Sequence, residues 1–155
     1  MPDRSLLHLT VAAVVCYQQR FLLVEERDKI TGALVLNQPA GHVEAGEDLF
    51  SAVQRELQEE TGLVLAPCAW LGISQLQAAN GHFYYRVNFV FEPLTLPEHY
   101  QPQDADILAL HWLNADELQQ AALPVRSSLV SHAISEYLQG VRLPLEALQP
   151  MVRMV

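Results

Sequence analysis

The chain has 155 residues, 50% of them hydrophobic, and its formal net charge is −9. This length and apolar content predict a single domain over residues 1–155 with a sizeable core. The negative charge argues against nucleic acid as a partner. No apolar run is long enough to span a bilayer, so we expect a cytoplasmic protein without a membrane partner, whose oligomeric state is left open.

The chain has two cysteines, Cys16 and Cys68. Both lie in apolar sequence surroundings, and their spacing is typical of neither a metal site nor a redox pair. We therefore predict two buried free thiols, as is usual in a reducing compartment.

The first quarter of the chain is rich in β-branched and aromatic residues, which indicate short strands. Strands are predicted over 9–17, 20–26 and 34–39. The polar pair Gln18-Gln19 predicts a tight hairpin turn between the first two. Pro39 ends the third, because proline cannot donate a hydrogen bond to a neighbouring strand.

A helix is predicted over 47–61, ending at Gly62 as helices commonly do. The rest of the chain predicts strands over 63–77, 82–93 and 107–113 and helices over 114–121 and 126–140. Asn80-Gly81 marks a hairpin turn between the first two of these strands. This order of strands and helices predicts an α/β layered domain with a mixed sheet.

Three glutamates lie close together in the first predicted helix, Glu56, Glu59 and Glu60. At roughly 100° per residue they share one face, beside an apolar stripe that packs on the sheet. Like charges at these spacings repel, and more strongly near a medium of low dielectric, so a cation should offset them. The alternative is an ordinary solvated helix face, which such a run of charges favours when it is considered alone.

The residues around the glutamates decide between these interpretations. A glycine loop, a helix and a glycine stop are formed by Gly41, Glu47, Arg55-Glu56-Leu57, Glu59-Glu60 and Gly62-Leu63. This segment resembles the Nudix box, with a match at every specified position. The resemblance implies a Nudix-like α/β/α sandwich with a mixed sheet. It also implies a hydrolase that uses Mg²⁺, or alternatively Mn²⁺, to cleave a small phosphoanhydride substrate.

The same resemblance implies the ligands of the metal. Glu56 and Glu60 would be the principal ligands, and Glu59 would join the same cluster or its water shell. The backbone carbonyl of Ala40, just before the box glycine, would complete the set. Carboxylate and carbonyl oxygens are the hard ligands that Mg²⁺ prefers.

Other residues of the box are expected to support this cluster. Arg55 would hold a glutamate in place, and the helical spacing makes Glu59 its local partner. Glu47, in the first turn, would support the loop, with a plain surface charge as an equal alternative. Gly41 permits a tight turn, and Gly62 ends the helix.

The sequence does not distinguish the group that accepts a proton from the attacking water. The box glutamates are candidates. The family often takes this base from a later loop, and the loop 94–106 contributes four more candidates, Glu98, His99, Asp104 and Asp106. Loop acids are mostly solvated, which is the alternative for each of these.

The segment 82–93 alternates between two faces. Phe83 and Tyr85 begin the face predicted to be core, whereas Tyr84 and Arg86 lie on the other face. An arginine there needs a partner, so we expect Arg86 to contact either a substrate phosphate or an acidic side chain.

Three more residues are candidates for substrate contact. Gln38 and Tyr84 would hold the organic part of the substrate, Gln38 by hydrogen bonds to a heterocycle. His42, beside the box glycine, would touch phosphate. Ordinary strand-end polarity is the alternative for Gln38, and a surface or loop-packing role is the alternative for His42.

The resemblance extends beyond the box. Residues 37–49 and 126–146 look like the NudJ-type phosphatase branch of the Nudix family. That branch hydrolyses nucleoside tri- and diphosphates and hydroxymethylpyrimidine pyrophosphate, releasing orthophosphate. Two rivals remain: a Nudix enzyme that cleaves ADP-ribose or a dinucleotide polyphosphate, and a non-enzymatic Nudix module that only binds nucleotide.

Overall fold

The computed structural model describes residues 2–154. Its strands are β1 (Leu7–Tyr17), β2 (Arg20–Arg27), β3 (Leu34–Asn37), β4 (Ala40–His42), β5 (Ala69–Gln77), β6 (Phe83–Phe91) and β7 (Ile107–Leu113). Its helices are α1 (Leu49–Thr61), α2 (Ala115–Gln119) and α3 (Ser128–Leu138), with 3-10 turns at Arg4–Leu6 and Leu145–Ala147. Across the described residues, no helix has the length and apolar character needed to cross a membrane.

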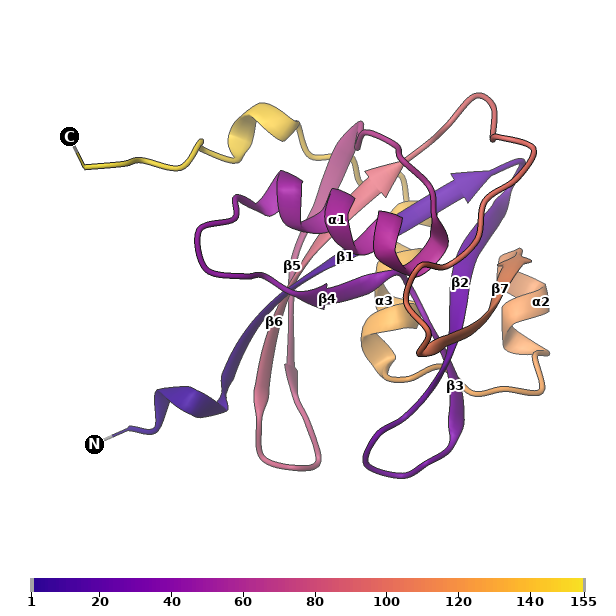
Figure 1. Ribbon diagram of the computed structural model, residues 1–155, viewed down its shortest axis with the longest axis horizontal. Helices are drawn as coiled ribbons and strands as arrows, with labels where there is room; N and C mark the ends of the chain where they lie inside the picture. The colour runs from indigo at the N-terminus through magenta and orange to yellow at the C-terminus, as the bar shows by residue number, and fades with distance from the viewer. Residues whose placement is uncertain (1, 155) are drawn as a thin grey trace.

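The strands form one mixed sheet, with the main order β3-β2-β1-β6-β5 (Figure 1). β1 runs parallel to β6 and antiparallel to β2 and β4. It pairs with β2 only through Cys16 and Tyr17, whereas β4 pairs with its middle, beside Thr10 to Ala12. The sheet therefore divides along β1, and the β5–β6 hairpin and the β2–β3 loop point downward as two separate projections in Figure 1.

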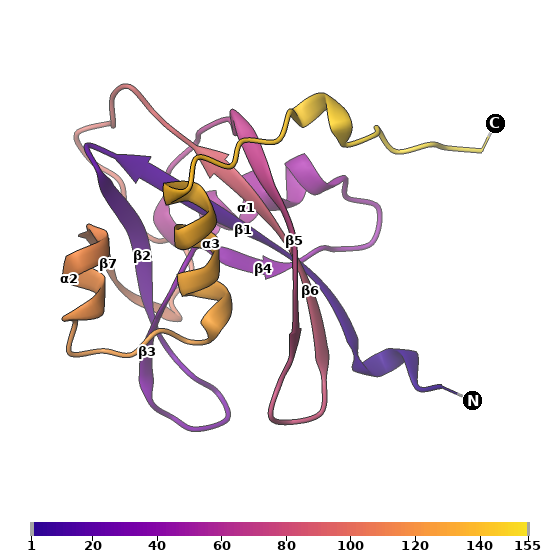
Figure 2. The same cartoon turned by 180° about the vertical axis from the view of Figure 1, so that it is seen from behind.

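Helices cover both faces of the sheet. One core joins α1 to the odd-numbered residues of β1 and β6, such as Val11 and Val87. A second core joins α3 to the even-numbered residues, such as Val14 and Val90. Figure 2 shows α3 in front of the sheet and α1 behind it. This arrangement confirms the predicted α/β/α sandwich with a mixed sheet.

The ends of α1 follow from local sequence. Asp48 caps the helix, because its carboxylate accepts a hydrogen bond from the backbone N–H of Ser51, so the helix begins two residues later than predicted. Gly62 ends it with φ +81°, as predicted. A side chain at Gly62 would also collide with the backbone of Gln101. The glycine therefore lets the loop 94–106 pack against the end of α1.

Each predicted strand is found, but the strands predicted over 34–39, 63–77 and 82–93 are shorter in the structure, and β4 was not predicted. Gln18 and Gln19 have φ +50° and +65°, as expected for the tight turn of the β1–β2 hairpin. The strand predicted over 63–77 begins only at Ala69. Pro67 lies in the preceding loop, where it has no hydrogen to donate to a sheet.

The prediction of two buried thiols is wrong. Cys68 is exposed and Cys16 is only partly buried. Cys68 lies in the loop before β5, where its Sγ donates to Oε1 of Glu92 at 3.4 Å.

The predicted core face of β6 is only partly correct. Phe83 and Tyr85 are 40% and 36% exposed, and neither belongs to the core beneath α1. From Arg86 onward both faces of β6 are buried, because the strand lies between β1 and β5 and between the two helix layers. Alternation of buried and exposed residues therefore does not describe β6. Its first three residues are not buried, and from Arg86 onward all of its residues are buried.

Candidate active site

The site begins where β4 passes under α1. A Cβ built on Gly41 would collide with the carboxylate of Glu56, so only glycine allows this close approach of strand and helix. The sequence predicted a tight turn for Gly41, and the structure adds this steric requirement. The segment from β4 through the loop to α1 thus places the glutamates of the helix directly beside the backbone of residues 40–42.

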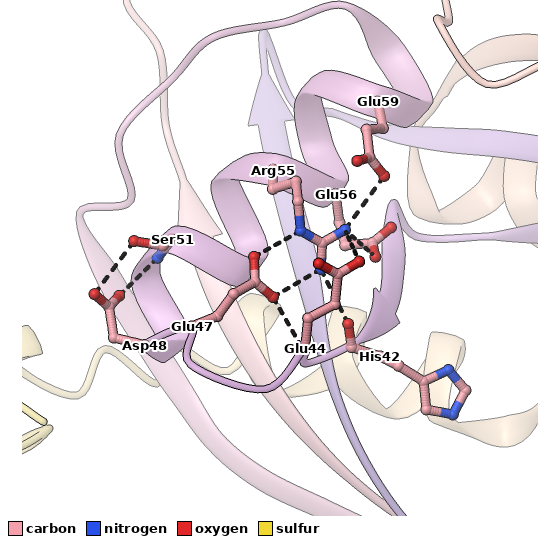
Figure 3. A network of polar contacts seen from close by, with 8 residues as sticks. All are labelled: His42, Glu44, Glu47, Asp48, Ser51, Arg55, Glu56 and Glu59. Atoms are coloured by element: carbon pink, nitrogen blue, oxygen red, sulfur yellow. Dashed lines mark hydrogen bonds and ion pairs between the residues drawn. The ribbon is translucent and has the colours of Figure 1, made fainter.

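Arg55 organises the acidic face of α1 (Figure 3). Its Nε and Nη2 donate to both carboxylate oxygens of Glu47, at 2.6 and 2.8 Å. Its Nη1 donates to Glu56 at 2.8 Å and to Glu59 at 3.2 Å. Nη2 also donates to the carbonyl of His42 at 3.1 Å. Arg55 therefore contacts Glu59 as predicted. Its bidentate partner is Glu47, which links the loop to α1 and is not a plain surface charge.

The charges in this network reinforce one another. The hydrogen bonds from Arg55 lower the pKa of Glu47, and the same bonds raise the pKa of Arg55. Glu47 also accepts a hydrogen bond from the backbone N–H of Glu44 at 2.9 Å. The loop and the first turns of α1 are thereby fixed by one ion-paired unit.

Glu60 is the most buried carboxylate of the site, with 4% of its surface exposed. Its Oε1 accepts a hydrogen bond from the backbone N–H of Ala40 at 2.9 Å. Burial nevertheless raises the pKa of Glu60 to about 9, and burial also raises the pKa of Glu56 despite its bond to Arg55. A nearby cation is what such carboxylates require to ionise fully at neutral pH.

The donor set fits a hard divalent cation. Within residues 2–154 no three His, Cys, Asp or Glu side chains already converge as a complete metal cage. Mg²⁺ does not need one, because it keeps several waters and commonly binds through one or two carboxylates together with substrate phosphates. Glu60 supplies a buried carboxylate and Glu56 a partly buried one, and the half-exposed Glu59 shares Arg55 with Glu56.

The loop 94–106 is tied to the end of α1. The backbone N–H groups of Gln103 and Asp104 donate to the carbonyl of Glu59 at 2.8 and 2.9 Å. The charge of Asp104 contributes to the raised pKa of Glu60. The carboxylate of Asp104 accepts a hydrogen bond from the backbone N–H of Asp106 at 2.9 Å.

The other base candidates of this loop have different surroundings. Glu98 and His99 line a groove of about 780 Å³ with Tyr100 and Trp112. Asp106 is 3.9 Å from the ammonium of Lys29. Of the four candidates, Asp104 is the one whose backbone N–H binds the carbonyl of Glu59.

Arg86 is buried, with 5% of its surface exposed, but it does not pair with a carboxylate. Its Nη2 donates to Oε1 of Gln38 at 2.7 Å and to Oδ1 of Asn37 at 3.2 Å, and its buried Nε has no partner in the described residues. Burial lowers the pKa of Arg86 to about 10, still far above neutral pH, so its charge is kept.

Gln38 differs from the prediction that it reads a heterocycle. It is 1% exposed, its Oε1 accepts from Arg86, and its Nε2 donates to the carbonyl of Val130 at 3.0 Å. Both ends of the amide are thus occupied inside the protein. Gln38 holds Arg86 in position and links it to α3.

Sequence reasoning missed two residues of this network, Glu26 and Arg126. Oε1 of Glu26 accepts from Nη1 of Arg126 at 2.7 Å and from Nδ2 of Asn37 at 3.1 Å. The charge of Glu26 acts on both Glu60 and Arg86. The only sequence signal was the charge at the end of strand β2, because the partners are 100 residues apart.

Four ring side chains, His8, His42, His82 and Tyr84, gather next to the site, and we refer to them as the ring cluster. Nδ1 of His8 lies 2.8 Å from Nε2 of His42, and Nε2 of His8 lies 2.6 Å from Nδ1 of His82. The rings of His8 and Tyr84 stack at 4.5 Å between centroids. His8 and His82 were not predicted as site residues.

His42 was predicted to touch phosphate. Its carbonyl accepts from Arg55, but its ring points away from the glutamates (Figure 3) and contacts His8. Burial lowers the pKa of His42, and His8 acts in the same direction. The side chain thus joins the ring cluster rather than the acidic face.

Comparison with known proteins agrees with this geometry. The chain matches the family model of the Nudix domain over residues 6–133. Phosphatase NudJ of Escherichia coli strain K12 is 42% identical over 139 residues, which make up 90% of this chain and 88% of that protein.

Solved structures show the same fold. A Nudix hydrolase from Nitrosomonas europaea superimposes with a TM-score of 0.84 at 36% identity, covering 93% of this chain and 97% of that one. The Nudix domain of Shewanella oneidensis NrtR, solved with ADP-ribose, gives a TM-score of 0.63 at 24% identity, covering 85% of this chain and 86% of that one.

Proposed function

Because the chain belongs to the Nudix family of hydrolases, we propose that it uses Mg²⁺, or alternatively Mn²⁺, to hydrolyse small di- and triphosphates with release of orthophosphate. The observation that carries this proposal is a pair of carboxylates, the buried Glu60 and the partly buried Glu56, held against the backbone of β4. Their raised pKa values favour a cation as partner.

Glu56 and Glu60 would be the principal metal ligands, with Glu59 and the carbonyl of Ala40 completing the set. When bound, the cation would neutralise phosphate charge and lower the pKa of the attacking water. The protein's own contribution is positioning. Arg55 fixes Glu56 and Glu59, and Glu47 in turn fixes Arg55 through its bidentate contact.

Asp104 would accept the proton of the attacking water. Its backbone is anchored to the end of α1, and its charge acts on Glu60. A carboxylate close to a cation is the type of group that takes a proton from a polarised water. Asp104 also lies on a loop, which allows the small adjustment that a bound substrate requires.

Arg86 would stabilise the negative charge of the substrate without leaving its buried position. Its guanidinium keeps a full charge and is held by the Gln38 and Asn37 amides rather than by a carboxylate. A buried cation that is not neutralised by an ion pair acts strongly on nearby phosphates. The absence of a paired carboxylate among the described residues supports a substrate phosphate as the partner of Arg86.

The proposed substrates are nucleoside tri- and diphosphates and hydroxymethylpyrimidine pyrophosphate. Similarity to phosphatase NudJ supports release of orthophosphate. ADP-ribose stays the alternative, as does a module that only binds nucleotide. Turnover of a broad panel of phosphoanhydrides, with products separated by chromatography, tests these against one another. We further propose that the protein acts in the cytoplasm as one Nudix domain on a small diffusible substrate.

Hydrolysis of a nucleoside triphosphate in ¹⁸O-labelled water is expected to place the label in orthophosphate, with nucleoside diphosphate as co-product. The reason is that a phosphatase reaction attacks the terminal phosphorus. Mass spectrometry of the separated products measures this directly. Pyrophosphate together with nucleoside monophosphate would contradict the proposal and indicate cleavage of the inner bond.

Replacement of Arg55 by alanine is expected to lower kcat by roughly 10- to 100-fold, with a smaller rise in KM, because unheld glutamates misplace metal and water. Arg55→Lys keeps the charge but loses the bidentate contact with Glu47, so it should recover only part of the loss. Steady-state kinetics of both variants give the two parameters, with Arg142→Ala as a distant control. An effect confined to KM would instead indicate direct phosphate binding by Arg55.

A further inference from the structure

The ring cluster lies on the same face of the sheet as Arg86. His8 is opposite Tyr84 in the parallel pairing of β1 and β6, and Thr10 is opposite Arg86. Tyr84 is thus two residues before Arg86 on the same side of the strand, and His42 reaches the cluster from β4, opposite Thr10. The helix that carries the glutamates covers the opposite face of the sheet, so it is Arg86, proposed above to act on the phosphates, that shares the face of the cluster.

The distance between the ring cluster and the backbone that binds Glu60 follows from the strand pairing. Ala40, whose backbone binds Glu60, is opposite Ala12 of β1, and His8 lies four residues earlier in that strand. At about 3.3 Å per residue this is roughly 13 Å along the sheet. A sugar and two phosphates bridge such a distance, so the rings lie where the organic end of a substrate would reach.

The cluster is not part of the hydrophobic core. None of its four residues belongs to either of the two cores that join the helices to the sheet. Rings that served only packing would be expected in those cores, as Phe89 and Phe91 are. The four rings instead remain partly or largely exposed.

The cluster has polar atoms to offer. The imidazoles are hydrogen-bonded to one another through His8. Within the described residues, Nδ1 of His42, Nε2 of His82 and the hydroxyl of Tyr84 have no hydrogen-bond partner in the protein. The three atoms surround a stacked pair of rings, which combines a flat surface with hydrogen-bonding groups at its edge.

We propose that the ring cluster, His8, His42, His82 and Tyr84, binds the heterocyclic group of the substrate by aromatic contact and by hydrogen bonds to its edge. This inference rests on the proposed function and adds the residues that would select the substrate. The protein would prefer phosphoanhydrides that carry a flat heterocycle over those that carry none. Stacking of one base on aromatic side chains is strong enough to give such a preference and tolerates different bases.

The test compares a ligand with a ring to one without. Calorimetry with Mg²⁺ measures binding of adenosine 5′-(β,γ-methylene)triphosphate and of methylenebisphosphonate to Tyr84→Leu and His8→Leu. We expect Kd for the nucleotide analogue to rise by roughly 10- to 100-fold, with Kd for the bisphosphonate unchanged. Tyr85→Leu is the matched control, because Tyr85 is the next residue on the opposite face of β6, and it should leave both values unchanged.

Other outcomes overturn the inference. If Tyr84→Leu and His8→Leu bind the nucleotide analogue as well as the wild type does, the rings take no part in recognition. If both ligands weaken equally, the rings support the fold or the metal site instead. Turnover of a nucleoside triphosphate is measured separately, so a protein that binds the analogue through these rings but hydrolyses nothing would refute the proposed function alone.

Discussion

Excess chelator is expected to abolish phosphoanhydride hydrolysis by this protein, and added Mg²⁺ to restore it. Glu60 is buried and Glu56 is partly buried, and burial raises the pKa of both. In the proposed function, these carboxyls and the phosphates of the substrate bind the same cation. Without a cation, nothing in this cluster neutralises the charge of the phosphates or lowers the pKa of the attacking water. The loss should therefore be essentially complete, rather than the few-fold loss expected of a cation that only stabilises the fold.

Phosphate release from a nucleoside triphosphate, measured with EDTA and after titration with Mg²⁺ or Mn²⁺, checks this result. Circular dichroism of the chelated protein serves as the control, because loss of folded structure would also abolish turnover. Full activity in a large excess of chelator, with the fold retained, would place the chemistry elsewhere.

The sequence was sufficient for features that depend on neighbouring residues. The apolar stripe and the stop at Gly62 both belong to one helix, so α1 was predicted to within two residues at its start. The cap at Asp48, which sets that start, was not predicted. The hairpin at Gln18-Gln19 is equally local. The match to the Nudix box added the strand-to-helix frame, which periodicity alone does not provide.

Features that depend on strand pairing were beyond local sequence. Glu26 and Arg126 meet across 100 residues, and His8 and His82 across 74. Nothing near any of these residues marks it as part of a site. Their meeting is decided by the register of β1 against β6 and by the position of α3, which only the folded chain displays.

Two misplaced predictions on the sheet have the same origin. Gln38 looked like a free polar residue at a strand end, but the division of the sheet brings Arg86 and α3 against it. Phe83 and Tyr85 looked like core, but the β5–β6 hairpin extends beyond the cover of α1. In both cases burial is decided by the neighbouring layer rather than by the residue's own strand.

Replacement of Glu60 by glutamine is expected to lower kcat by roughly a hundredfold or more, which is at least the loss that follows removal of residues that merely support metal ligands. The change removes one ligand charge while keeping the volume of the side chain and an oxygen that can accept from Ala40 N–H. Steady-state kinetics at saturating Mg²⁺ measure the loss. Glu136→Gln, on α3 and beside His132, is the matched control and should keep wild-type turnover.

Glu60→Gln should lower activity but raise the stability of the metal-free protein at alkaline pH. In the metal-free wild type, burial raises the pKa of Glu60 from 4.5 to about 9, so the folded protein keeps a proton that the unfolded chain releases. That contribution is fully present below pH 4.5 and is lost as pH rises through about 9, so the free energy of unfolding falls across this window. A glutamine amide cannot ionise, so in chelator the Glu60→Gln variant should match the wild type near pH 5 and exceed its Tm near pH 8. Thermal unfolding at both pH values measures this, and adding Mg²⁺ at pH 8 should stabilise the wild type more than the variant. A variant that is inactive and also less stable at pH 8 without metal would show that Glu60 supports the fold rather than a cation.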